Sequence, residues 1–245
     1  MNVQQAAEKA QLDIGLSSQQ PALAADSLLG LWQQAVADSA ERPAFTCLGQ
    51  TLSYGEIDQL AERIAGYFHN QLKLEAGDRL AVQLPNLLQY PVVVIAAWKL
   101  GLVIVNTNPM YTHRELVHQF NDSGAKAVVV LDQFYDTLQA ALPETGIEHV
   151  VVTRAIDLLP QPKKSLLTAV TKVLGKRPSL PSKGIVGFND MLAAESAYPL
   201  HTPAYDDISA LQYTGGTTGV SKGVMLTQGS LMSNVAQTMA MVSAG

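Results

Sequence analysis

The chain has 245 residues, of which 47% are hydrophobic, and it carries a net charge of −5 at pH 7. This length and composition are sufficient to bury a substantial core, as one large domain or two small ones. The negative charge gives no indication of a nucleic-acid partner. The single cysteine, Cys47, excludes a disulfide within the chain and favours a reducing compartment.

The sequence shows no segment typical of export or membrane insertion. Residues 1–20 lack the apolar core of a signal peptide. The longest apolar stretch, 90–105, is interrupted by Pro91, Lys99 and Gly101 and is too short for a transmembrane helix. We therefore expect a soluble cytoplasmic protein.

Helix and strand patterns alternate along most of the chain. In chain order we expect a helix at 28–37, a hairpin at 44–54 that turns at Gly49, a helix opened by the capping box of Ser53 and Glu56, a strand at 79–84, a buried helix at 87–100 and a strand at 102–105. A helix then opens at the capping box 112–115 and ends at Gly124, followed by a strand at 126–131, a helix at 134–142, strands at 148–153 and 208–213, and a helix at 228–242. This alternation predicts an α/β fold of mostly parallel sheets with helices on both faces.

A glycine- and threonine-rich segment at 213–223 follows the last predicted strand, and it is called the phosphate loop below. Its sequence is Tyr-Thr-Gly-Gly-Thr-Thr-Gly-Val-Ser-Lys-Gly. Glycines let backbone N–H groups approach an anion closely, and a lysine adds a charge that suits a phosphate. We expect the N-terminus of the helix at 228–242 to strengthen this anion site.

Other phosphate, hydrolase and metal motifs are missing from the sequence. The Walker A pattern fails because Ser221 replaces its second glycine and Gly223 stands where magnesium needs a hydroxyl. There is no G-x-G-x-x-G and no G-x-S-x-G nucleophile motif. The histidines share no metal-ligand spacing beyond the isolated pair His113 and His118, so we expect no protein-bound metal. Asp206 and Asp207 are interpreted as a turn leading into the strand, with a magnesium role as the alternative.

The segment 154–183 differs in composition from the rest of the chain. It holds seven basic residues and one acid, and prolines bracket it. Five apolar residues in it share one helical face: Leu166, Leu167, Val170, Val173 and Leu174. A basic amphipathic helix of this kind fits a peripheral membrane contact, here on the inner face of the cytoplasmic membrane. The alternative is a surface helix docked on its own domain.

The phosphate loop resembles the signature of the adenylate-forming (acyl-activating, AMP-binding) superfamily, [YF]-T-[SG]-G-[ST]-T-G-x-[PS]-K-G, with Ser221 where most members have proline. The stretches 52–57, 98–109 and 111–116 resemble further motifs of this family. The resemblance runs from residue 26 to the last residue, and 1–25 are an N-terminal extension. Within this family, Gly215 and the basic segment 154–183, called the basic insert below, are similar to features of the bacterial long-chain fatty-acid–CoA ligases.

The resemblance implies an acid–thiol ligase that forms acyl-CoA, AMP and pyrophosphate from a long-chain fatty acid, ATP and CoA through an acyl-adenylate. It implies phosphate binding, with Mg²⁺ bridging the phosphates, by these residues: Thr214, Gly215, Gly216, Thr217, Thr218, Gly219 and Lys222. No catalytic residue is expected within the chain. The family's later motifs and its C-terminal domain are not found, so we expect a partial N-terminal AMP-binding domain that is inactive alone and open to forming a homodimer. The alternatives are another carboxylic-acid adenylating enzyme and a non-catalytic module that binds nucleotide or membrane.

Overall fold

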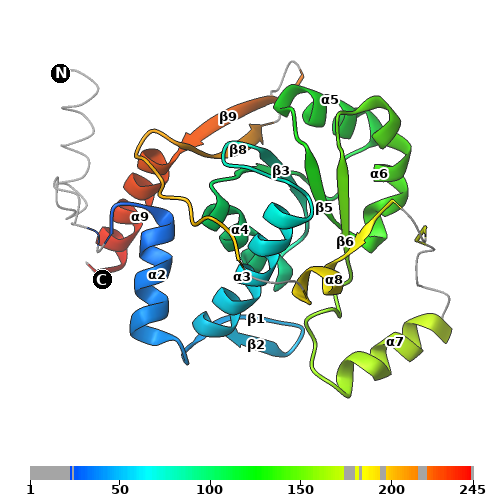
Figure 1. The fold of residues 1–245 in the computed structure, drawn as a ribbon, viewed down its shortest axis with the longest axis horizontal. Helices are drawn as coiled ribbons and strands as arrows, with labels where there is room; N and C mark the ends of the chain where they lie inside the picture. Colours follow the sequence, from blue (N-terminus) through cyan, green and yellow to red (C-terminus); the bar gives the residue numbers. More distant parts are fainter. Residues whose placement is uncertain are drawn as a thin grey trace.

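The structure is a computed structural model, which describes residues 23, 25–173, 180–181, 184–193, 197–214 and 220–243. Figure 1 shows a twisted central sheet with helices on both faces and helix α7 set apart from the body of the molecule. The α/β fold class predicted from the sequence is confirmed. The phosphate-loop residues 215–219 lie outside the described residues.

The first part of the chain forms a helix, a hairpin and a long helix. They are α2 (Leu28–Ser39), β1 (Pro43–Cys47), β2 (Gln50–Ser53) and α3 (Tyr54–Asn70). The hairpin is antiparallel and turns through Leu48 and Gly49, which both have positive φ. The predicted capping box opens α3, because Ser53 N donates to Glu56 Oε2 at 2.8 Å and Glu56 N donates to Ser53 Oγ at 3.2 Å.

The remaining elements build a seven-stranded sheet and its covering helices. The strands are β3 (Arg79–Gln83), β4 (Val103–Asn106), β5 (Ala127–Leu131), β6 (His149–Thr153), β7 (Val186–Gly187), β8 (Ile208–Thr214) and β9 (Lys222–Thr227). The α-helices are α4 (Gln89–Leu100), α5 (His113–Ser123), α6 (Tyr135–Ala141), α7 (Lys163–Val173), α8 (Phe188–Leu192) and α9 (Gln228–Ser243), and two short 3₁₀ turns flank α6. The spatial order is β7-β6-β5-β3-β4-β8-β9. Every neighbouring pair is parallel except β8 and β9.

Two apolar layers enclose the sheet. On one face, α3, α4 and α8 pack against strand side chains such as Leu80 and Val129. On the other face, α5 and α6 pack against the alternate positions, such as Ala81 and Val128. Because both faces are covered, the central strands are apolar at nearly every position, as the five buried residues of β5 show.

The segment after the phosphate loop corrects the sequence prediction. We expected the helix at 228–242 to place its N-terminus at the anion site, but β9 lies between the loop and α9. This strand pairs antiparallel with β8 from Thr214↔Lys222 back to Ile208↔Thr227. The N-terminus of α9 therefore lies at the other end of the hairpin, where Gln228 N donates to Asp207 O at 2.9 Å. The ladder between β8 and β9 satisfies the backbone hydrogen-bonding groups of 222–227, a segment for which the sequence predicts neither a strand nor a helix.

Candidate functional site

Thr214 and Lys222 stand at the two sides of the phosphate loop. They are direct partners in the ladder between β8 and β9, so their side chains lie on the same face of the hairpin. Both side chains are exposed, and no ion pair of Lys222 is found within the part of the chain that the structure describes. The charge of Lys222 is thus available to an anion at this position. Of the seven predicted phosphate-binding residues, these two can be placed, whereas Gly215, Gly216, Thr217, Thr218 and Gly219 lie outside the described residues.

Tyr213 and Gly223 fix the base of the phosphate loop on the opposite face of the hairpin. They are the next ladder pair, and Tyr213 is 6% exposed. A methyl group on Gly223 would stand 2.9 Å from Cζ of the Tyr213 ring. The glycine of the Lys-Gly dipeptide is therefore required by packing under an aromatic ring.

Helix α5 contacts both sides of the phosphate loop. The Tyr213 hydroxyl donates to Asp122 Oδ2 at 2.6 Å, and the His118 ring lies edge-on to the Tyr213 ring at 6.4 Å between centroids. His118 Nε2 lies 2.8 Å from the carbonyl oxygen of Ser221. Burial and the neighbouring Asp122 carboxylate raise the pKa of Tyr213, so its phenol stays protonated and acts as a donor.

Helix α5 is itself well defined at its two ends. Thr112 N and Thr112 Oγ1 donate to Glu115 Oε2 at 2.8 and 2.7 Å, which forms the predicted capping box. Both bonds lower the pKa of Glu115, and the bond from the Thr112 side chain has the larger effect. Gly124 ends the helix with a left-handed φ of 61°, as predicted.

A crevice of about 590 Å³ opens at the carboxyl ends of β3, β4 and β8, next to the phosphate loop. Strands β3 and β4 lead to helices on opposite faces of the sheet, α4 and α5, and ligands of open α/β sheets bind at such points. The wall of this crevice contains a chain of hydrogen bonds between neutral side chains. The Tyr90 hydroxyl donates to Asn106 Oδ1 at 2.7 Å, and Asn106 Nδ2 donates to Gln212 Oε1 at 3.0 Å.

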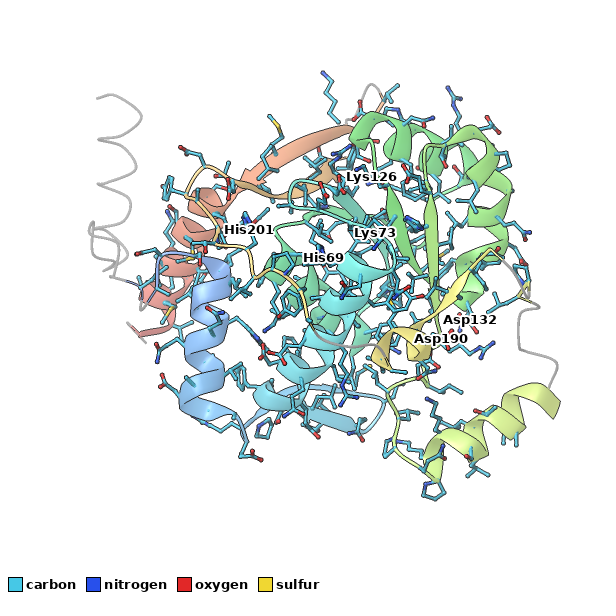
Figure 2. All side chains as sticks on the ribbon, in the orientation of Figure 1. His69, Lys73, Lys126, Asp132, Asp190 and His201 are labelled. Atoms are coloured by element: carbon cyan, nitrogen blue, oxygen red, sulfur yellow. The ribbon has the colours of Figure 1, made fainter. Side chains whose placement is uncertain are left out.

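A second cavity, of about 520 Å³, lies at the amino ends of the same strands. Asp207 lines this cavity together with His201, which is labelled in Figure 2. Asp207 holds a turn, since its Oδ2 accepts from Ala204 N at 2.8 Å and lies 3.2 Å from His201 Nε2. The Ala204 backbone bond, with His201 beside it, lowers the pKa of Asp207. The geometry agrees with a turn leading into β8, at the end of the sheet away from the phosphate loop.

The histidine pair of α5 does not converge on one point. His113 Nε2 lies 3.0 Å from Glu144 Oε1, towards α6, whereas His118 points to Ser221. Across the described ranges, no group of three histidine, cysteine, aspartate or glutamate side chains is arranged to hold a metal ion.

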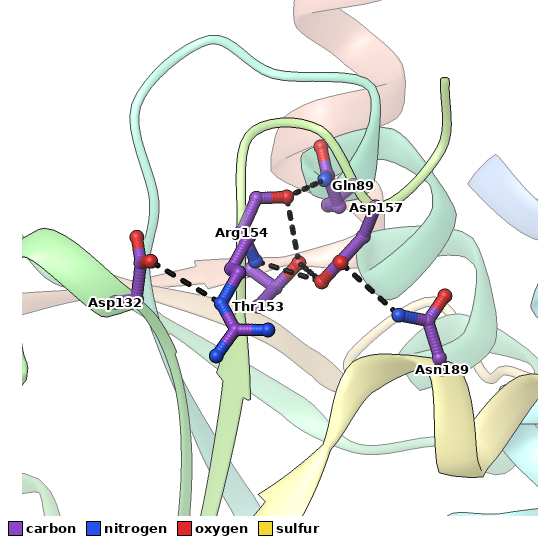
Figure 3. Close-up of polar contacts among 6 residues, drawn as sticks. All are labelled: Gln89, Asp132, Thr153, Arg154, Asp157 and Asn189. Carbon is purple, nitrogen blue, oxygen red and sulfur yellow. Dashed lines mark hydrogen bonds and ion pairs between the residues drawn. The ribbon is translucent and has the colours of Figure 1, made fainter. Parts of the chain in front are cut away.

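Polar contacts at the start of the basic insert tie it to the core (Figure 3). Asp157 is 8% exposed and its carboxylate accepts from Arg154 N at 2.7 Å, from Thr153 Oγ1 at 3.1 Å and from Asn189 Nδ2 at 3.0 Å. Arg154 Nε lies 3.5 Å from Asp132 Oδ2. The first residues of the basic insert, Arg154 to Asp157, are therefore held against the folded domain by these contacts.

Helix α7 begins at Lys163, within the predicted amphipathic segment. Lys163 Nζ donates to Leu48 O at 2.6 Å, and Lys164 Nζ donates to Asp157 O at 2.7 Å. Leu166 and Val170 are 66% and 42% exposed, which contradicts a helix docked on the domain through its whole apolar face. The Val173 side chain and Leu174 lie outside the described residues. In the portion of the chain that the structure describes, every helix is too short or too polar to cross a bilayer.

The contribution of α5 to the phosphate loop is not predicted from the sequence. There, His118 stands out only as half of a metal spacing, and no motif marks Asp122. Their partners lie 103 and 91 residues away in the chain. The only local signal is that the two polar residues are four apart, which places them on one helical face.

Comparisons with known proteins show the family to which the sequence is similar. The profile of the family described as "AMP-binding enzyme" matches residues 32–244. A long-chain-fatty-acid–CoA ligase of Haemophilus influenzae is 40% identical over 215 residues, which are 86% of this chain and 38% of that ligase. The chain thus spans about two fifths of the length of this relative.

Solved structures of the same kind superpose on most of the chain. A long-chain-fatty-acid–CoA ligase from Archaeoglobus fulgidus superposes with a TM-score of 0.70 at 24% identity, over 93% of this chain and 41% of that one. ATP-bound MatB from Rhodopseudomonas palustris superposes with a TM-score of 0.65 at 26% identity, over 85% of this chain and 36% of that one. The first similarity establishes the fold, and the second comes from a protein with bound ATP.

Proposed function

Because this chain belongs to the AMP-binding enzyme family, we propose that it is the N-terminal, phosphate-binding portion of an ATP-dependent long-chain fatty-acid–CoA ligase. The ligase would convert a fatty acid, ATP and CoA into acyl-CoA, AMP and pyrophosphate through an acyl-adenylate. The observation that carries the proposal is the β8–β9 hairpin, which holds Thr214 opposite an exposed Lys222 at the phosphate loop.

The reaction requires an anionic carboxylate to attack the α-phosphate of an anionic triphosphate. Lys222 would offset that repulsion, and the backbone N–H groups and hydroxyls of 214–219 would bind the β- and γ-phosphate oxygens. The neighbouring crevice would hold the rest of the nucleotide in line with the attacking acid. These residues bind and orient the triphosphate, and none is assigned as a nucleophile or a general base.

Magnesium would enter this site with the nucleotide. The donors at the sides of the loop, the Thr214 hydroxyl and the Lys222 ammonium, suit phosphate oxygens and offer no carboxylate to a bare divalent cation. Mg²⁺ would supply further charge neutralisation to the triphosphate, which Thr214 and Lys222 would hold.

The test is acyl-CoA formation, together with trapping of the acyl-adenylate as a hydroxamate, for this chain and for a longer version that contains the sequence following it in the gene. We expect activity in the longer version and a fall of at least about 100-fold in Lys222→Ala, because a charge-assisted phosphate contact is lost. The matched control is Arg114→Ala, which removes an exposed positive charge from α5 and should retain activity.

A panel of acids of different length and shape in the same assay separates the alternatives. Preference for aryl or short acids would identify another adenylating enzyme. Nucleotide binding without any acyl transfer in the longer version would favour a non-catalytic module.

We also propose that α7 makes a peripheral contact with the inner face of the cytoplasmic membrane, from which a long-chain acid would be drawn. The exposed side chains of Leu166 and Val170, and the further basic residues of the segment, support this contact. Lys163 and Lys164 support it less, since both donate to oxygens of the protein.

Co-sedimentation with vesicles tests the membrane contact. We expect the chain to bind vesicles that contain anionic lipid. The double variant Leu166→Asp/Val170→Asp should lower the vesicle affinity by at least about tenfold, because each apolar side chain that enters the membrane contributes to binding. Met110→Asp is the control, since Met110 is 76% exposed and belongs to a different segment. Equal binding by both variants would contradict the proposal.

A further inference from the structure

The two sides of the phosphate loop are attached to a single turn of α5. Tyr213 precedes Gly215 and its hydroxyl donates to Asp122, whereas Ser221 follows Gly219 and its carbonyl oxygen bonds to His118. His118 and Asp122 are four residues apart on one helix, so both contacts come from the same face. Neither contact is between neighbours in sequence, because the chain separations are 91 and 103 residues.

We propose that His118 and Asp122, here called the α5 clamp, are positioning residues that set the distance between the two sides of the phosphate loop. This distance would keep Thr214 and Lys222 placed to bind a triphosphate. The nature of the ligand rests on the proposed function, but the mechanical role does not. The clamp residues act through Tyr213 and Ser221, the residues that their side chains contact.

The direction of each hydrogen bond supports a fixed geometry. A carbonyl oxygen only accepts, so His118 Nε2 must carry a proton, and it does so both in the cation and in one neutral tautomer. The Tyr213 hydroxyl donates to a carboxylate at 2.6 Å, a charge-assisted bond that is stronger than a neutral one.

Packing adds to the rigidity of this arrangement. Tyr213 is 6% exposed and its ring lies directly over Gly223 in the adjacent strand. The His118 and Tyr213 rings meet edge to face, at an interplanar angle of 85°. A shift of either side of the loop must therefore disturb α5, whose ends are fixed by the capping box and Gly124.

The first experiment measures hydrogen–deuterium exchange in the 245-residue chain without ligand. We expect His118→Ala and Tyr213→Phe each to speed exchange at the amides of Lys222 and Gly223 by roughly three- to tenfold, which is the effect of losing one hydrogen bond. His118→Gln keeps an N–H donor and should restore most of the protection. His113→Ala is the matched control, because it removes a histidine of the same helix that points towards α6.

The second experiment measures MgATP affinity of the same variants by equilibrium dialysis. We expect His118→Ala and Tyr213→Phe to weaken binding by a similar factor, and the double variant to lose less than the product of the two, because the contacts act on one loop. His118→Gln should bind as the unsubstituted chain does. If Tyr213→Phe does not fold, His118→Ala carries both experiments.

The outcomes separate this inference from the proposed function. Unchanged exchange in His118→Ala, or an equal change in His113→Ala, overturns the α5 clamp whatever the ligand. Normal MgATP affinity in His118→Ala overturns the positioning role while the proposed function stands. No MgATP binding by the unsubstituted chain counts against the proposed ligand, and the exchange data then decide the clamp alone.

Discussion

Single residues at the base of the phosphate loop explain why its sequence is constrained beyond the ligand. Gly223 has no room for a side chain, because its pleat position faces the Tyr213 ring. Lys222 is exposed on the opposite face of the same strand. One dipeptide therefore serves two purposes, with the glycine allowing the aromatic anchor and the lysine providing the charge.

We expect Gly223→Ala to lower the free energy of unfolding by about 1–3 kcal/mol, as overpacking does. The added methyl would stand 2.9 Å from the Tyr213 ring and displace it from Asp122. Chemical denaturation measures the change. Gly146→Ala is the control, since a methyl group added at Gly146 would meet nothing within 4 Å; equal stability of the two variants would contradict this account of Gly223.

At the scale of elements, local chemistry specified most helices and strands. Both capping boxes form, and the glycines that follow the predicted helix at 87–100 and the α5 helix, Gly101 and Gly124, adopt left-handed φ. The sequence reading missed β7, α8 and β9. The first two are only 2 and 5 residues long, and β9 is defined by its pairing with β8 more than by its own pattern.

The capping box of α5 predicts a dependence of stability on pH. Thr112 holds the pKa of Glu115 below its usual value, so the folded state binds its proton less readily than the unfolded state does. The stabilisation is therefore present above the unfolded pKa of 4.5 and is lost as pH falls through the lower folded pKa.

We expect Glu115→Gln to reduce the stability of the chain at pH 7 by less than about 1 kcal/mol, because the carboxylate is exposed and glutamine can still cap. The difference from the unsubstituted chain should vanish near pH 3, measured by urea denaturation. Glu41→Gln, in an exposed turn, is the control and should show no such convergence. A difference that grows at low pH would contradict the assignment.

At the scale of the whole molecule, the strand order creates the site. Because β4 lies between β3 and β8, the carboxyl ends of three strands meet beside the phosphate loop and form the crevice. The same order brings α5, which follows β4, against the β8–β9 hairpin. The α5 clamp is therefore a consequence of topology.

The exposed apolar side chains of the β8–β9 edge predict self-association of this chain. Val224 and Met225 in β9 are 47% and 64% exposed, and Met239, Met241 and Val242 in α9 are also exposed. We propose a homodimer through this edge at micromolar concentration, detected by sedimentation. Met225→Lys should weaken it and Met110→Lys should not; a monomer throughout that range would contradict the prediction.

The α/β class, nearly all helix and strand positions and the phosphate-loop motif can be predicted from the amino-acid sequence, because periodicity, caps and glycines act over a few residues. Family membership followed from the same local motifs. Three features become visible in the folded molecule: α9 begins at the far end of the hairpin, Gly223 lies under Tyr213, and His118 and Asp122 reach the loop. The contacts of His118 and Asp122 join residues 103 and 91 positions apart, and strand pairing and order, which no local pattern encodes, bring them together.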